Sequence, residues 1–265
     1  MIFLAQYLKA NRVGLLVWTL AHMTLILMVA AGATAIETQA DSLFNAFSEW
    51  MPRGLQSFLG FAPGMSKIDS YIQAKTGALL SLTLPIYATL LAAGVVTREV
   101  DSGTADFLLS LPTRRRDIML GRWVGMCVNL AVLALTSWGA VALGLKAKGL
   151  TGSFYGYFWM CINCFLLAVA IGSINLAASV WIDDYSSGVR ILLAVVVGLF
   201  FVDLGMRIAD LPYAARFFNP FSHYDPAYAI KNGGMPACSL LTLLLMSAVS
   251  LIVAVKKFEE KQIET

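Results

Sequence analysis

The sequence predicts an all-α, polytopic membrane protein with six transmembrane helices and both termini in the cytoplasm. Of its 265 residues, 58% are hydrophobic and 13% are charged, whereas soluble domains carry about 25% charged residues. The mean hydropathy is +0.74. A helix needs roughly 20 apolar residues to cross a hydrocarbon core of about 30 Å, where no water can satisfy its backbone. Six segments qualify, at residues 13–36, 76–97, 118–145, 154–181, 189–207 and 237–255.

The first three spans are delimited by charges. The sequence Ala-Thr-Ala at 33–35 imitates a signal-peptide cleavage site, but the apolar run before it starts at Val13. That run is longer than the core of a signal peptide, so we expect an uncleaved helix. The second span ends before Arg98, and the third follows the arginines at 114–116.

The last three spans are long apolar runs with few polar side chains. The fourth contains Cys161 and Cys164, but a zinc site would need a second such pair or nearby histidines, and the chain has two histidines in all. We therefore expect small apolar side chains here. In the fifth span, Asp203 and Arg207 are four residues apart on one helix face, which predicts a local ion pair.

Three asparagines lie inside the predicted spans. Polar residues within a membrane are costly and often functional. Asn129, Asn163 and Asn175 are therefore candidates for a substrate path. The alternative, which we favour, is that they form hydrogen bonds between helices, as such side chains commonly do.

Basic residues predict the orientation of the chain. An even number of spans places both termini on one side, and loops rich in Lys and Arg stay in the cytoplasm. With the termini inside, that side holds 11 of the 19 basic residues, namely Lys9, Arg12, Arg98, Arg114, Arg115, Arg116, Arg122, Arg190, Lys256, Lys257 and Lys261.

Two long loops are then exposed on the outer side. Residues 37–75 mix aromatic and charged side chains with prolines and glycines, which predicts short helices at the membrane surface. Residues 208–236 are rich in aromatics and in turn-forming pairs such as Asn219-Pro220, so this loop is expected to dip into the outer leaflet or lie against it. His223 lies there, and we interpret it as structural.

The sequence contains none of several motifs typical of enzymes. There is no GxxxxGK[ST] loop to bind nucleotide phosphates, no HExxH helix and no GxSxG elbow. We therefore expect no catalytic, cofactor-binding or metal-binding residue in this chain, and no nucleic-acid partner. An intramembrane enzyme is the alternative that these absences disfavour.

The most informative polar segment lies between the second and third spans. Asp101 and its neighbours offer N-cap oxygens, and Pro112 stops a helix. This pattern predicts a short amphipathic helix over about 101–111 at the membrane surface, with Phe107, Leu108 and Leu111 on one side. Its apolar side could bury itself in lipid headgroups or in a groove on a partner protein.

The order of residues in this segment is similar to that of a known family. The residues concerned are, in chain order, Glu99, Gly103, Thr104, Leu108, Leu109, Pro112, Arg115, Ile118, Gly121 and Arg122. This order resembles the signature of ABC-2 type transporter permeases, the membrane subunits of bacterial ATP-binding cassette exporters. The family commonly has lysine at the position of Arg122, which keeps the charge and alters the hydrogen-bond geometry.

The resemblance implies that the short helix is a coupling helix, docked on a separate ATPase subunit that binds ATP and Mg²⁺. The coupling residues would be Glu99, Gly103, Thr104, Phe107, Leu108, Leu111, Pro112, Arg115 and Arg122. It further implies location in the bacterial inner membrane, contact with lipid, and pairing with a second permease copy or paralogue to export a small or amphipathic substrate. A membrane anchor or regulator of an ATPase that does not transport is the alternative.

Overall fold

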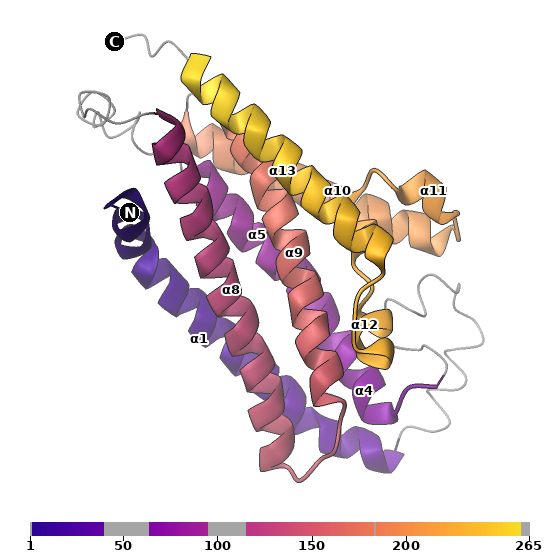
Figure 1. Cartoon of the computed structure of the whole chain (residues 1–265). Coiled ribbons are helices and arrows are strands. Elements are labelled where there is room, and N and C mark those ends of the chain that lie inside the picture. The colour runs from indigo at the N-terminus through magenta and orange to yellow at the C-terminus, as the bar shows by residue number, and fades with distance from the viewer. Residues whose placement is uncertain (1, 40–63, 95–114, 183, 261–265) are drawn as a thin grey trace.

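The computed structural model describes residues 2–39, 64–94, 115–182 and 184–260, and every regular element within these ranges is a helix (Figure 1). Six helices there are long and apolar enough to cross a membrane, which confirms the prediction of an all-helical chain with six such helices. They are α1 (Ile2–Gln39), α4 (Lys67–Ile72) continued through η1 (Gln73–Gly77) into α5 (Ala78–Ala93), α8 (Arg115–Ala147), α9 (Phe154–Ser179), α10 (Tyr185–Ile208) and α13 (Ala237–Glu260). Between α10 and α13 lie the short helices α11 (Tyr213–Arg216), η2 (Pro220–His223) and α12 (Pro226–Asn232).

Helix α9 is the centre of the bundle. In its most apolar window 78% is buried, against 17% in α1 and 22% in α10. Helices α5, α8 and α13 pack on α9, and α1 packs on the outside of α8 (Figure 1). The core therefore surrounds α9, whereas α1 and α10 expose most of their apolar surface.

The start of α1 and the end of α13 lie at the same end of the bundle, together with the start of α8 (Figure 1). We name this the terminal end, and the opposite end, where the turn between α8 and α9 lies, the far end. This arrangement is what an even number of spans requires. That the terminal end faces the cytoplasm stays a prediction.

The second membrane helix begins earlier than its hydropathy predicted, at Lys67 and not at Thr76. Ser66 caps the start, because its Oγ accepts a hydrogen bond from the Asp69 amide at 3.0 Å and donates one to the Asp69 carboxylate at 2.8 Å. Asp69 is held from α9 as well, where Tyr157 donates its hydroxyl to the carboxylate at 2.6 Å. The helix therefore includes charged residues that a hydropathy criterion excludes.

Glycines allow α1 to approach α8 closely. A Cβ atom on Gly144 of α8 would lie 2.5 Å from the Cβ of Ala30, and one on Gly125 would overlap the ring of Tyr7. Gly139 of the same helix has nothing within 4 Å of its Cβ position. Close packing of this kind is typical of helix pairs in membranes, where small residues let backbones approach.

Replacing Gly144 by valine should weaken the contact between α1 and α8. Overpacking of a tight contact costs about 1–3 kcal/mol, because backbones must move apart. Gly139→Val is the matched control, with the same change of helix propensity and open space around it. Thermal unfolding of the purified protein in detergent should show a loss for Gly144→Val only; equal losses in the two variants would contradict the close packing.

Candidate functional site: buried polar side chains of the bundle

Two of the three asparagines join neighbouring helices. Asn175 of α9 donates its Nδ2 to Thr89 Oγ1 of α5 at 2.7 Å. Tyr87 of α5 donates its hydroxyl to Asn129 Oδ1 of α8 at 3.5 Å. All four side chains are buried. The geometry therefore gives Asn129 and Asn175 contacts between helices, and their role in a substrate path stays a prediction.

Asn163 differs from the other two asparagines. It is fully buried in α9, and neither its amide nitrogen nor its oxygen has a hydrogen-bond partner among the described residues. One turn earlier on α9, the sulfur of Met160 lies 3.4 Å from the Cβ position of Gly77 in the π-helical turn η1. In that turn the Thr76 hydroxyl is likewise buried without a partner. A buried polar group left unpaired costs about 1–3 kcal/mol.

The contact between α9 and η1 is therefore a candidate functional site. Turns of π-helix often lie at functional sites, and unpaired polar groups kept in an apolar interior need an explanation other than packing. Among the described residues, no group of three or more His, Cys, Asp or Glu side chains could hold a metal. Cys161 and Cys164, next to this site on α9, are buried free thiols.

The predicted ion pair of α10 is confirmed. Arg207 Nε lies 2.6 Å from the Asp203 carboxylate, and both residues are buried. The guanidinium also donates to the carbonyl oxygens of Phe221 at 3.1 Å and Tyr224 at 3.2 Å. The ion pair thus supplies donors to the backbone of η2 and the residue after it.

Residues 220–224 are buried inside the protein. They pack against α9, α10 and α13. Tyr224 donates its hydroxyl to the carbonyl of Gly77 at 3.1 Å, which joins this segment to the π-helical turn. This part of the 208–236 loop is sheltered by neighbouring helices, as backbone at membrane depth has to be, and its position relative to the outer leaflet stays a prediction.

His223 is held by two hydrogen bonds. Its Nε2 donates to the Phe217 carbonyl at 2.8 Å, and its Nδ1 therefore accepts the bond from the Tyr213 hydroxyl at 2.7 Å. Burial lowers the pKa of His223 below its ordinary value of 6.5, although the Phe217 hydrogen bond and the Asp203 charge act in the opposite direction. The geometry suits a neutral histidine.

Most of the predicted coupling residues lie outside the described residues. These are Glu99, Gly103, Thr104, Phe107, Leu108, Leu111 and Pro112. Arg115 begins α8, and Arg122, almost two turns further, is 8% exposed and so faces the protein interior. The two helices that flank the segment, α5 and α8, are both linked to α9 by the hydrogen bonds of its core, since Trp123 of α8 also donates to Ser173 at 2.8 Å.

The sequence matches a known protein family over nearly its whole length. Residues 12–263 match the family described as ABC-2 family transporter protein. The chain belongs to this family. Membership in the ABC-2 family confirms the resemblance seen in residues 99–122 and agrees with the six helices of the bundle.

Two relatives of this ABC-2 protein carry the description "Probable ABC transporter permease protein NosY". The one from Stutzerimonas stutzeri is 32% identical over 96 residues, which are 36% of this chain and 33% of the relative. The one from Pseudomonas aeruginosa is 30% identical over 117 residues, which are 40% of this chain and 42% of the relative. The match thus spans less than half the length of these curated relatives.

Removing the carboxylate of Asp203 should destabilise this ABC-2 protein strongly. Asp203→Ala leaves the Arg207 guanidinium buried without its counter-charge, and breaking a buried pair in this way costs about 3–5 kcal/mol. Thermal unfolding in detergent measures the loss. Asp117→Ala, which removes an exposed acid from the first turn of α8, is the control; a loss no larger than this control would contradict the role given to the ion pair.

His223 should make the stability of the protein depend on pH. Because its pKa is lower in the folded than in the unfolded state, its contribution is complete above pH 6.5 and is lost as the pH falls through the folded-state pKa. Unfolding temperatures between pH 7.5 and 5 should therefore fall less for His223→Gln than for the wild type. Tyr213→Phe keeps the imidazole but removes the hydroxyl that donates to the neutral ring, so its slope should lie between the other two; identical slopes for all three proteins would contradict this account.

Proposed function

We propose that the chain is the permease subunit of an ABC-2 type exporter in the bacterial inner membrane. The observation that carries the proposal is the family match over residues 12–263. The six apolar helices support it, and the lack of a phosphate-binding loop in this sequence fits a permease whose ATP is bound by a partner subunit. Two such permeases, identical or related, would form the pathway for a small or amphipathic substrate.

The segment of residues 98–112 would receive the movement of the ATPase. It connects the end of α5 with the start of α8 at the terminal end, where both described chain ends also lie. Docking of an amphipathic coupling helix there would place the ATPase next to α5 and α8, which are both hydrogen-bonded to α9. Its residues Glu99 and Gly103 are the first candidates for this contact.

Hydrogen bonds inside the bundle would carry that movement further. Asn175 joins α9 to α5, and the Trp123–Ser173 bond joins α9 to α8. These three helices would therefore shift as one rigid body, which is a common form of conformational change. Asn163 of α9 and Thr76 of η1 are buried without a partner among the described residues, so a shift of these helices against the rest of the bundle would give their polar groups access to water or substrate.

The test is to separate insertion from coupled transport. A Glu99→Ala, Gly103→Pro double variant should insert and bind lipid normally but lose most of the stimulation of ATP hydrolysis and of vesicle export. The readouts are co-purification with a candidate ABC ATPase subunit, ATPase activity and transport in vesicles. Lys148→Ala, at the far end of the bundle, is the control and should behave like the wild type.

The outcomes of this experiment distinguish the alternatives. Normal export by the double variant would show that the segment does not couple the ATPase to the helices. Binding and regulation of the ATPase with no export in the wild type would favour a membrane anchor or regulator. Export lost together with ATPase binding supports the proposal.

A further inference from the structure

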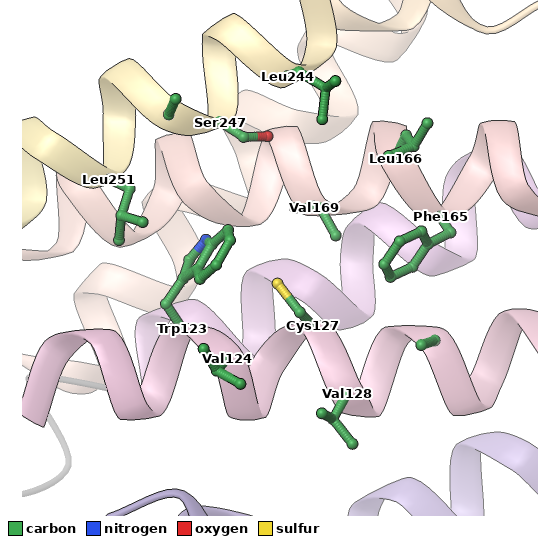
Figure 2. Close-up of a pocket in the computed structure, with 12 residues that line it drawn as sticks. Trp123, Val124, Cys127, Val128, Phe165, Leu166, Val169, Leu244, Ser247 and Leu251 are labelled. Carbon is green, nitrogen blue, oxygen red and sulfur yellow. The ribbon is translucent and has the colours of Figure 1, made fainter. Parts of the chain in front are cut away.

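A groove with a volume of about 680 Å³ opens between α8, α9 and α13 (Figure 2). Residues of α9 form its floor, and those of α8 and α13 form its walls. Its principal lining side chains are Trp123, Cys127, Phe165, Val169, Leu244 and Leu251. In Figure 2 the indole of Trp123 points from α8 toward the other two helices, and the ring of Phe165 lies between α9 and α8.

The polar atoms of the groove are already bonded within the protein. Trp123 donates its indole N–H to Ser173 Oγ at 2.8 Å, and Ser247 donates its hydroxyl to the Leu243 carbonyl at 2.9 Å. Cys127 is a free thiol, which behaves as a small apolar group. The groove therefore offers no hydrogen bond that a polar cargo would need, and hydrocarbon fits it best.

The depth of the groove matches one leaflet of a bilayer. On α8 it runs from Trp123 to Ala131, which is about 12 Å at 1.5 Å per residue. Ala131 is the middle residue of α8, whose bounds are Arg115–Ala147. With α8 centred in the membrane, the groove extends from near the boundary of the hydrocarbon to its middle, and one leaflet supplies about half of a 30 Å core.

On the other wall the groove lies around the middle of its helix, because the bounds of α13 are Ala237–Glu260. The groove residues of α13 that lie furthest apart are Leu244 and Leu251, 16 and 9 residues before the end of the helix at Glu260. Trp123 and Ala131 lie 8 and 16 residues after the start of α8 at Arg115. The wall of α8 thus places the groove between the middle of the bilayer and the terminal end, and the wall of α13 places it around the middle.

A cation lies above the groove at that end. Arg116 is exposed and precedes Trp123 by seven residues, which puts it on the same face of α8. Two lysines, Lys256 and Lys257, are exposed on α13, and Lys257 pairs with Glu260 at 2.6 Å. The other acidic residues in these parts of α8 and α13 are Asp117 and Glu259. An arginine above an apolar groove matches the order of groups in a phospholipid, with phosphate at the surface and hydrocarbon below.

We propose that this groove holds one acyl chain of a phospholipid from the leaflet at the terminal end, with the lipid phosphate beside Arg116. The site is separate from the contact between α9 and η1. It also does not depend on the proposed export, because its ligand is a component of the membrane itself.

Trp123 provides a direct test. Phosphatidylglycerol with a brominated acyl chain, titrated into the full-length protein in detergent, should quench Trp123 and reach saturation. The difference between wild type and Trp123→Phe isolates this signal from the other five tryptophans. Ala248→Phe places a ring in the groove and should weaken binding by about tenfold or more, which corresponds to about 1.4 kcal/mol. Ala21→Phe, on the exposed face of α1, is the matched control and should bind like the wild type.

Three results would overturn the proposal. Quenching that rises without saturation, or that is equal in Ala248→Phe and the wild type, would mean that the groove is not a specific binding site for a lipid acyl chain. A change of mass from dimer to monomer in Ala248→Phe, without any change in quenching, would assign the groove to a second copy of this chain. Unchanged affinity in Arg116→Ala would remove the phosphate contact. Equal unfolding temperatures of the two alanine-to-phenylalanine variants show that Ala248→Phe is folded.

Discussion

Hydrocarbon provides no hydrogen-bond partners, so the polar groups within this bundle depend on one another. The Asp203–Arg207 pair shows the consequence most clearly. Its guanidinium satisfies two carbonyls of residues 220–224, which helps this short segment to lie between the long helices. The segment in turn places Tyr224 on the carbonyl of Gly77. The ion pair of α10 thus helps to hold residues 220–224 against the π-helical turn η1 of the second membrane helix.

The same constraint explains the central position of α9. Helix α9 presents Asn163, Ser173 and Asn175 to its neighbours, and a helix with this many polar groups is costly to expose to lipid. Helix α1, by contrast, shows a nearly continuous apolar surface and lies at the edge of the bundle. The order of the layers therefore follows the distribution of polar residues more than hydropathy alone.

Hydropathy predicted the six spans because length and apolar content are properties of each segment by itself. It did not predict the start at Lys67, since Lys67, Asp69 and Lys75 lower the local hydropathy, and the contact of Asp69 with Tyr157 depends on the fold. The ion pair of α10 was predictable because its partners are one turn apart. The groove at Trp123 was not, because its depth depends on how α8 and α13 diverge across α9. The family signature at 99–122 depends only on residue order and so could be read directly.

The π-helical turn determines which side of the second membrane helix faces α9. Asp69, which precedes the turn, is hydrogen-bonded to Tyr157, and Thr89, which follows the turn, is hydrogen-bonded to Asn175. Both ends of this helix therefore contact α9. In an uninterrupted α-helix, two residues 20 positions apart point about 200° away from each other, toward nearly opposite sides. The wider turn at Gln73–Gly77 reduces that offset. If the turn tightened to an α-helix, the helix would have to rotate away from one of its two anchors, so the turn is an angular spacer that lets one helix hold its neighbour at both ends.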